Sequence, residues 1–402
     1  MATLAIGAIG ATPYTEVKYK FSDGEAITSK YPIHALIQRK SIKFDKTIVL
    51  LTDGAREKHW DGDTGMQAAL KITGKAGEIC DVSIKDGKNE GELWIIFDAI
   101  VENVSNGDEL YIDITQGFRH LPVLLLIACT YLRAARNITI KSISYGAFES
   151  GTKEQQNGRL VVTECDVFEL LPYVALFDWS NATEAFQRSG DAGVLAELLR
   201  TSAKGLHPNV SKPLNNVAQK LDNVTLALEL ARPEEASAEV KELTKELEIG
   251  QESLKQYAKP FALLNTLIST TFEKIGLPQT RTGTSSLESK LETQRNLIKW
   301  YESKKRLALA VLLAREWLVS EHMVVIKGVN KIDNYDDRED ASYDLGNNQK
   351  TSPKMHNVWK KLHRVRNDIA HMGQTNQTNN RITARSLQSE IKATLKMLDN
   401  VE

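Results

Sequence analysis

The sequence has few cysteines, and their spacing argues against a structural zinc site. Cys80, Cys129 and Cys165 are the three cysteines among 402 residues. No two of them form a CxxC pair, so we expect no bound structural metal. An odd number of cysteines without local pairing fits a reducing compartment. We therefore expect a cytoplasmic protein.

The sequence also lacks an excess of charge and a long hydrophobic run. Lysine and arginine total 51 and aspartate and glutamate total 52, which gives a formal net charge of -1. Any contact with nucleic acid must therefore be local. The most apolar run, Leu121 to Leu132, is too short to span a bilayer and predicts a buried helix. The opening residues lack a cationic segment, so we expect neither a secretion signal nor a membrane partner.

The remaining pattern changes character along the chain. In the first part, strand-like runs such as TIVLLT (residues 47–52) and Leu110 to Ile114 alternate with helix-like runs. This alternation predicts a doubly wound parallel sheet. After about Pro172, strand patterns end and helix formers dominate. Because 402 residues exceed one ordinary core, we predict an α/β domain followed by an all-α region.

The all-α region contains several well-patterned segments and one long polar segment. The predicted helices are Leu214 to Leu230, Pro233 to Leu247, Arg306 to Val325 and Lys354 to Met372. Gly373 is expected to stop the last of these helices. The segment from Asn330 to Ser352 is rich in Asp and Asn and predicts a long surface loop.

Glycines and polar side chains follow three of the predicted strands. They occur in GAIGATPY (residues 7–14), TDG (52–54) and DITQGFR (113–119). Ligands in open α/β sheets bind beyond the carboxyl ends of strands, near the point where the strand order reverses. A helix N-terminus together with Arg119 suits a phosphate. The first segment is not a GxGxxG fingerprint, so a nicotinamide cofactor is not predicted.

A purely structural interpretation of the third segment stays open. Thr115 and Gly117 can simply make a tight turn from strand to helix, and Asp113 can cap the helix that follows.

The segment Asp113 to Pro122 resembles the DxTHG-motif family of CRISPR-associated proteins, which carry a CRISPR-associated Rossmann fold (CARF) domain. The resemblance extends to four other places: Gly10 and Tyr14, Thr52 to Trp60, Ser144 to Glu149, and Phe177 to Trp179. It implies a Rossmann-like parallel sheet domain over residues 1–180 that senses a cyclic oligoadenylate. Cyclic tetra-adenylate is the first choice, and cyclic hexa-adenylate is the second.

The same resemblance implies a set of ligand-binding residues. They are Gly10, Thr12, Tyr14, Thr52, Asp113, Thr115, Gln116, Gly117, Phe118 and Arg119. Gln116 replaces the usual histidine of the motif. Glutamine can still hydrogen-bond a phosphate or ribose, but it cannot serve as an acid or base. Ligand binding is therefore expected, and cleavage of the ligand by this domain stays open.

The predicted helix from Lys354 to Met372 carries the string RNDIAH at its end. At about 100° per residue, one narrow stripe faces the core, formed by Val358, Leu362, Val365, Ile369 and Met372. Asn367 and His371 lie on the opposite side, and Arg366 lies on the flank. A solvated polar face is the structural alternative. Six histidines receive no functional role: His34, His59, His207, His322, His356 and His363.

Arg366 to His371 resembles the Arg-x4-6-His motif of HEPN ribonucleases, including the Asn after the Arg. Its position behind a CARF-like domain implies a CARF–HEPN ribonuclease of a type III CRISPR system. The resemblance places a helical linker at residues 181–295 and a HEPN domain at 296–402. The substrate would be single-stranded RNA.

The implied chemistry needs no metal, because RNA supplies its own 2′-hydroxyl nucleophile. His371 would transfer protons, Arg366 would clamp the phosphate, and Asn367 would hold the imidazole. The expected product end is a 2′,3′-cyclic phosphate. Because one Arg–His set per chain is sparse, we expect a homodimer, or an assembly of dimers, with a shared cleft.

Three questions stay open from the sequence. Arg315 and Glu316 lie inside an apolar helix, where they form either an internal ion pair or a support beside the cleft. A ligand-responsive transcription regulator without nuclease activity is the alternative function, although no recognition helix with a basic patch is clear. A toxin-type HEPN nuclease whose N-terminal domain binds another nucleotide is the third hypothesis for the function.

Overall fold

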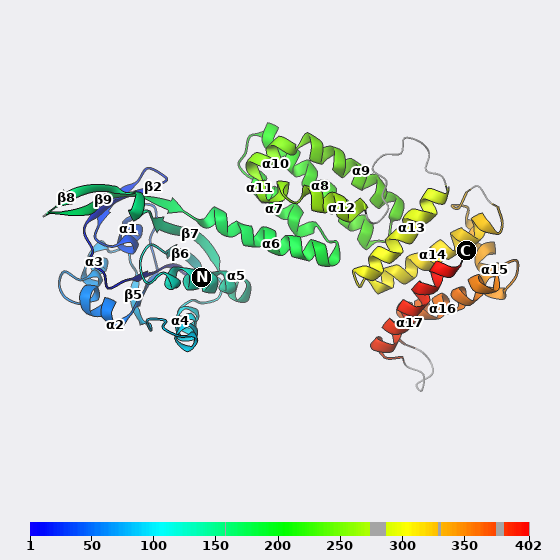
Figure 1. The fold of residues 1–402 in the computed structure, drawn as a ribbon, viewed down its shortest axis with the longest axis horizontal. Coiled ribbons are helices and arrows are strands. Elements are labelled where there is room, and N and C mark those ends of the chain that lie inside the picture. The colour runs from blue at the N-terminus through cyan, green and yellow to red at the C-terminus, as the bar shows by residue number, and fades with distance from the viewer. Residues whose placement is uncertain (157, 274–286, 329–330, 375–381, 402) are drawn as a thin grey trace. The chain divides into compact units, whose positions relative to one another are not determined.

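The computed structural model describes residues 1–156, 158–273, 287–328, 331–374 and 382–401. The chain divides into two compact units, Met1–Ala175 and Leu176–Glu402, and each is described by itself (Figure 1). The first unit is built on a sheet and the second is helical, so the predicted fold class is confirmed. In the stretches that the structure describes, no helix is long and apolar enough to cross a membrane.

A nine-stranded sheet forms the centre of the first unit. Its middle is parallel, in the order β7-β6-β1-β4-β5. These strands are β1 (Thr3–Ile9), β4 (Lys46–Leu51), β5 (Glu78–Ser83), β6 (Glu109–Asp113) and β7 (Thr139–Gly146). Because β4 and β5 lie on one side of β1 while β6 and β7 lie on the other, the strand order reverses between β1 and β6.

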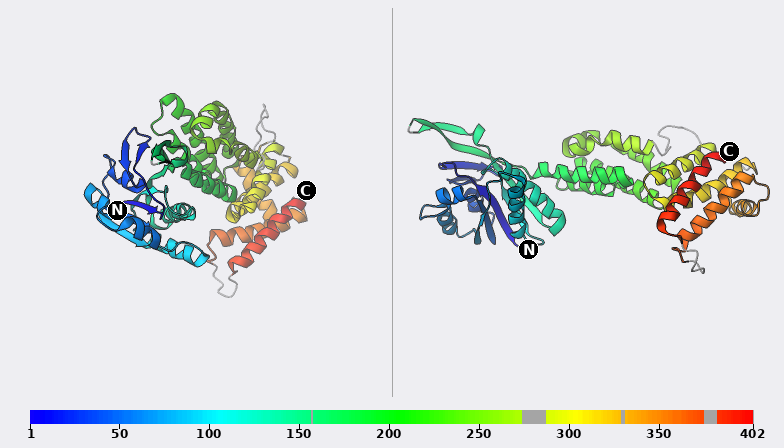
Figure 2. Two further views of the ribbon diagram at one scale, coloured as in Figure 1. Left: turned by 60° about the vertical axis from the view of Figure 1, so that its left-hand side comes forward. Right: turned by 60° about the horizontal axis from the view of Figure 1, so that its bottom comes forward.

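Four more strands extend the sheet beyond β7. They are β2 (Val17–Phe21), β3 (Ala26–Ser29), β8 (Thr152–Gln156) and β9 (Arg159–Glu169). β9 runs antiparallel to β7 and parallel to β2, which pairs with β3 at the edge. β8 pairs with β9 alone, and the two strands project from the sheet as a hairpin (Figures 1 and 2).

Helices cover both faces of the parallel strands. One face carries α1 (Pro32–Gln38), α2 (Asp53–Ala55), η1 (Arg56–Trp60) and α3 (Met66–Thr73). The other carries α4 (Glu90–Glu102) and α5 (His120–Arg136). β1 contributes Leu4, Ile6 and Ala8 to the second face and Ala5 and Ile9 to the first. Burial on both faces explains why such strands read as continuous apolar runs. The short helix η2 (Phe148–Ser150) follows β7.

The second unit is a helical assembly around one large hydrophobic core. Its helices are α6 (Leu171–Ser189), which begins in the first unit, α7 (Gly193–Ala203), α8 (Pro208–Glu229), α9 (Pro233–Ile249), α10 (Gln251–Tyr257), α11 (Lys259–Ala262), α12 (Asn265–Glu273), α13 (Leu287–Ser303), α14 (Leu307–Val325), α15 (Tyr335–Asn347), α16 (Pro353–Ala370), α17 (Ala384–Met397) and η4 (Leu398–Asn400). The sequence-derived boundary at residue 295 falls inside α13.

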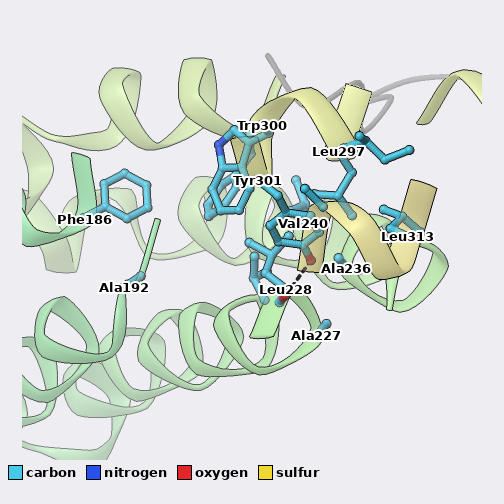
Figure 3. Packing of buried hydrophobic residues seen from close by; sticks show 14 of the residues in the cluster. Phe186, Ala192, Ala227, Leu228, Ala236, Val240, Leu297, Trp300, Tyr301 and Leu313 are labelled. Atoms are coloured by element: carbon cyan, nitrogen blue, oxygen red, sulfur yellow. Dashed lines mark hydrogen bonds between the residues drawn. The ribbon is translucent and has the colours of Figure 1, made fainter. Parts of the chain in front are cut away.

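Aromatic side chains of α13 join the earlier and later helices of this unit. Trp300 and Tyr301 pack beside Leu228 of α8 and Val240 of α9 (Figure 3). The Tyr301 hydroxyl donates a hydrogen bond to the backbone carbonyl of Leu228. That carbonyl lies near the C-terminal end of α8, where intrahelical donors run out. The bond therefore gives the buried Tyr301 hydroxyl a partner, adds to the backbone bond that this carbonyl accepts from Ala231, and ties α13 to α8.

The predicted surface loop from Asn330 to Ser352 is wrong, because α15 occupies most of it. The Asn334 side chain accepts a hydrogen bond from the Asp337 backbone and so caps the helix. Acidic side chains in the first turn are favourable at the positive end of the helix dipole. Ala341 and Leu345 supply the buried face. Good capping and dipole interactions thus outweigh a composition that is otherwise typical of loops.

The end of α16 also differs from the prediction. The helix ends at Ala370, and Met372 is 85% exposed instead of lying in the core. Met372 (φ 52°) and Gly373 (φ 69°) both adopt the left-handed conformation. The Gly373 N–H donates to the Asp368 carbonyl (2.9 Å), and the Met372 N–H donates to that of Ile369 (3.1 Å). This is a Schellman ending in which Met372 occupies the left-handed position that glycine usually takes, and Gly373, the predicted stop, follows one residue later and donates the closing hydrogen bond.

Candidate functional site

The loops after β1, β4 and β6 meet where the strand order reverses. Gly7 on β1 is the register partner of Asp113 on β6. Beyond these residues, a Cβ added to Gly10 would lie 3.7 Å from the backbone of Gly117. A Cβ added to Gly54 would lie 3.6 Å from the Cβ of Ala11. The fold therefore brings together the three segments that the sequence singled out, at the place where such sheets bind ligands.

Gly117 has a backbone that requires glycine. Its φ is 110°, and an added Cβ would lie 3.2 Å from Leu121 and 3.4 Å from Ala8. The turn interpretation of this glycine is therefore correct, and the turn also allows the β6 loop to approach the β1 loop. The capping interpretation of Asp113 is wrong, because α5 begins at His120 and its N-terminus has no side-chain cap.

Asp113 lies beneath the β6 loop and fixes its shape. Its Oδ1 accepts hydrogen bonds from the backbone N–H (3.0 Å) and the hydroxyl (2.6 Å) of Thr115. The Thr115 hydroxyl oxygen in turn accepts from the backbone N–H of Gly146 at the end of β7 (2.9 Å). Burial raises the pKa of Asp113 to about 6, although the bonds from Thr115 act in the opposite direction. Asp113 and Thr115 therefore position the loop.

Tyr14 and Thr52 have similar positioning roles in their loops. The Tyr14 hydroxyl accepts from the backbone N–H of Gly10 (2.7 Å), and burial raises the pKa of Tyr14 to about 12. Its ring packs edge-on against His59, whose Nε2 lies 2.8 Å from the carbonyl of Thr12. Thr52 caps α2 through the N–H of Ala55. His59 thus braces the β1 loop, a role that the sequence analysis missed.

Other residues of the predicted set reach the protein surface around these loops. Thr12, Phe118 and Arg119 are exposed, and Gln116 and Gly117 are half-buried. The Phe118 ring, 48% exposed, is stacked almost parallel on His120, with 5.8 Å between ring centroids and 10° between planes. One face of His120 supports Phe118, so Phe118 presents a preoriented aromatic surface. His120 could not be identified from the sequence, because a ring contact between a loop residue and the first residue of a helix leaves no periodic signal.

The side chains of α16 divide between a core face and a polar face. Met355, Val358, Trp359, Leu362 and Val365 are buried, and Ile369 packs at the edge of the core. The exposed cations are Lys354, Lys360, Lys361 and Arg364. Apart from Met372, this division agrees with the predicted stripe. A local basic surface therefore exists on a protein whose total charge is close to zero.

The structure brings Arg366 and Asn367 together on this helix. Arg366 is half-buried, and its Nη1 donates to Asn367 Oδ1 (3.1 Å). The Asn367 Nδ2 lies 3.3 and 3.4 Å from the two ring nitrogens of His363. His371 is exposed at the C-cap, and its backbone N–H donates to the Asn367 carbonyl (2.9 Å). The Asn367 amide therefore contacts His363, not the imidazole of His371 as predicted.

Arg315 and Glu316 form the internal ion pair that was one of their two interpretations. The Glu316 carboxylate binds Arg315 and also Arg338 of α15 (2.5 Å). Burial opposes ionisation of Glu316, but the two guanidinium groups hold its pKa below the usual range. The Arg315 guanidinium also lies over the Trp359 ring of α16, 5.2 Å from its centroid. The pair thus braces α16 from α14.

Comparisons with known proteins identify domains that are similar to the sheet domain and to part of the helical unit. Residues 4–149 match the CARF domain of the CRISPR system endoribonuclease Csx1, and residues 175–281 match the second domain of CRISPR-associated protein MJ1674. The N-terminal sheet domain is therefore similar to the CARF domains of CRISPR-associated proteins, as the resemblance implied.

One curated relative is the CRISPR-associated protein MJ1674 of Methanocaldococcus jannaschii. It is 26% identical over 313 residues, which make up 73% of this chain and 42% of the relative. The chain thus spans less than half of that relative's length.

In the described residues, no three or more His, Cys, Asp or Glu side chains gather as metal ligands.

Asp113→Asn is expected to change how stability depends on pH. Because burial raises the pKa of Asp113 from 3.8 to about 6, the folded chain holds a proton that the unfolded chain releases in this window. The wild type therefore loses stability as pH rises through the window, by at most about 3 kcal/mol. The amide variant does not undergo this loss, and it keeps the acceptor for Thr115.

Urea denaturation of both proteins below and above this window measures the difference. Asp108→Asn is a matched control, because Asp108 is also buried and accepts backbone hydrogen bonds from Ala2 and Ser105. If the free energies of unfolding of Asp113→Asn and of the wild type change equally with pH across the window, Asp113 does not titrate as described.

Proposed function

We propose that the protein is a metal-independent endoribonuclease for single-stranded RNA that is activated by a cyclic oligoadenylate. It would act in the cytoplasm as an ancillary effector of type III CRISPR antiviral defence. Support for the sensing half comes from the CARF match of residues 4–149. The observation that carries the nuclease half is the polar face of α16, where Arg366, Asn367 and His371 lie among exposed cations.

The crevice beside β1 and β6 suits an adenylate ligand. Phe118 offers an exposed aromatic surface on which a purine can stack. Arg119 and the N-terminus of α5 can bind phosphate oxygens. Cyclic tetra-adenylate is our first choice, and cyclic hexa-adenylate is the second. Gln116 contributes hydrogen bonds only, so we assign it no role in cleaving the ligand.

The α16 residues suit cleavage by the RNA 2′-hydroxyl. His371 is accessible and can move the proton at that oxygen or at the leaving group. Arg366 stays charged and can stabilise the phosphate as its charge develops. Neighbouring Lys360, Lys361 and Arg364 would hold the RNA backbone. The product would be a 2′,3′-cyclic phosphate. In this proposal residues 296–402 form a HEPN domain, and residues 181–295 form a helical linker.

An apolar face of the first unit supports a homodimer. Val123, Ile127 and Tyr131 of α5 are spaced four residues apart and are more than half exposed. Phe97 joins the Tyr131 ring to exposed Trp94 of α4. Apolar faces of this kind mark interaction surfaces. Because α5 starts at the crevice loop, pairing two copies through α5 would place two crevices near one axis, as a symmetric ring ligand requires.

Activation would follow from different affinities of the ligand for two states of this dimer. In the favoured state the two Arg366–His371 sets would be correctly spaced in one cleft. A coupling free energy on the order of 1–3 kcal/mol is typical for such systems. The transcription-regulator alternative gains little from the structure. α8, which follows the Lys204 region, is a core helix that buries Leu214, Val217, Leu221 and Val224.

His371→Ala and Arg366→Ala should each lower the rate of RNA cleavage by at least about 100-fold, because each removes a group that acts in the transition state. Purified full-length protein would be assayed on single-stranded RNA with no ligand and with each ring size. Asn357→Ala, an exposed position on the same helix, is the control. Equal rates with and without ligand would remove the activation step. Unchanged cleavage by His371→Ala would remove the assignment of the nuclease site to α16, and a wild type that cleaves no RNA would remove the nuclease function.

Phe118→Ala should weaken binding of cyclic tetra-adenylate by about 5- to 100-fold, because stacking contributes about 1–3 kcal/mol per base. Phe118→Trp keeps an aromatic surface and should bind nearly as well as the wild type. Titration calorimetry measures both. Leu160→Ala, an exposed apolar position on the projecting hairpin, is the control. Equal affinity of the Phe118→Ala and wild-type proteins would show that no base stacks at this ring.

Ile127→Glu should convert the dimer to a monomer, because it places a charge in the apolar face of α5. Sedimentation or light scattering measures the mass, and ligand-stimulated cleavage should fall together with the dimer. The matched control is Ile72→Glu on α3, where the isoleucine is 84% exposed. A wild type that is monomeric at assay concentration, or a variant that remains dimeric, contradicts this interface.

A further inference from the structure

The Asn367 amide links Arg366 to a histidine that the RNDIAH string does not contain. Arg366 Nη1 donates to Asn367 Oδ1 at 3.1 Å. On the other side, Asn367 Nδ2 faces the ring nitrogens of His363 at 3.3 and 3.4 Å. His363, Asn367 and His371 are spaced four residues apart, so they share one stripe of the helix surface. His363 and Asn367 thus lie on the same polar stripe as His371, and Arg366 lies beside it.

The donors and acceptors in this contact fix the direction of the amide. A guanidinium group can only donate, so the Asn367 oxygen must face Arg366. The amide nitrogen must then face His363, where a ring nitrogen that carries no hydrogen can accept. If the amide rotated by half a turn, its N–H groups would face those of the guanidinium. His363 therefore stabilises the one orientation in which Asn367 can hold Arg366.

Arg366 depends on this amide more than an exposed arginine would. Its Nε is buried without a partner in the part of the chain that the structure describes. Among the same residues, Asn367 Oδ1 is the acceptor that its side chain finds. The direction of the guanidinium is thus controlled largely through Asn367.

His363 is itself supported by a contact with a buried aromatic side chain. Its ring lies against Trp359, with 6.4 Å between centroids and 33° between planes. Trp359 is buried in the core, and the Arg315 guanidinium covers its ring at 5.2 Å. The ion pair of Arg315 with Glu316 anchors that guanidinium on α14. A connected series of contacts therefore runs from α14 through Trp359 and His363 to Asn367 and Arg366.

We propose that His363 is a positioning residue of the ribonuclease site. It fixes the Asn367 amide, which aims the Arg366 guanidinium at the scissile phosphate. This inference rests on the proposed function, and it assigns His363 no proton transfer and no contact with RNA. The effect should appear in kcat, because the aim of Arg366 matters most when charge develops on the phosphate.

Two substitutions of His363 separate positioning from packing. His363→Leu keeps an apolar contact with Trp359 but offers no acceptor. It should lower kcat by about 5- to 10-fold with little change in KM, as expected for one lost hydrogen bond. His363→Gln restores an acceptor and should return kcat to within about twofold of the wild type. Asn357→Ala again serves as the control, and thermal melting confirms that each variant folds.

A double-mutant cycle with Asn367→Ala tests the route of the effect. If His363 acts through Asn367, then His363→Leu should have no further effect in the Asn367→Ala background. Additive losses would overturn the inference, and so would equal losses in the leucine and glutamine variants. If the wild type cleaves RNA and His371→Ala does not, but His363→Leu cleaves like the wild type, the inference fails while the proposed function stands. A wild type that cleaves no RNA would overturn both.

Discussion

The parallel pairing of β1 with β6 is the constraint on which the candidate ligand site of the first unit depends. These strands are neighbours in the sheet, yet the first long helices after them, α1 after β1 and α5 after β6, cover opposite faces of it. Their following loops therefore face each other across a gap that no crossover helix fills. Gly10 and Gly117 let the two backbones approach, and the Asp113–Thr115–Gly146 hydrogen bonds hold the second loop against β7. A ligand crevice thus follows from the strand order before any particular side chain is considered.

The helical unit places its chemistry differently, on the outer face of a helix whose inner face is fully used by the core. α16 gains its position from buried residues such as Trp359 and Leu362. This leaves His371 exposed and Arg366 and Asn367 half-buried on the polar side of the helix. Arg366 and Asn367 contact each other along the helix, and the Arg315–Glu316 pair is linked to them through Trp359. In the proposed function, a single copy would present half of a site that the pairing of two chains completes.

Helices and strands with a clear pattern of buried residues could be predicted from the sequence. Contacts that depend on the direction of a side chain could not. TIVLLT identified β4 because a strand covered on both faces is apolar throughout, and the α16 stripe follows from helical periodicity. α15 was missed because its stability comes from the Asn334 cap and the acidic first turn, which composition alone hides. The contact between Asn367 and His363 depends on rotamers, and the stack of Phe118 on His120 depends on a turn. Neither leaves a periodic signal.

The continuous core of the helical unit limits how a signal can cross it. Tyr301 fastens α13 to the end of α8, and the surrounding interior is filled by large side chains such as Trp317 and Phe261. Packed interiors of this kind compress little and pass strain on. The helices that share this core are therefore expected to shift together, so a substitution that loosens Tyr301 or Trp317 would be felt in helices that it does not touch.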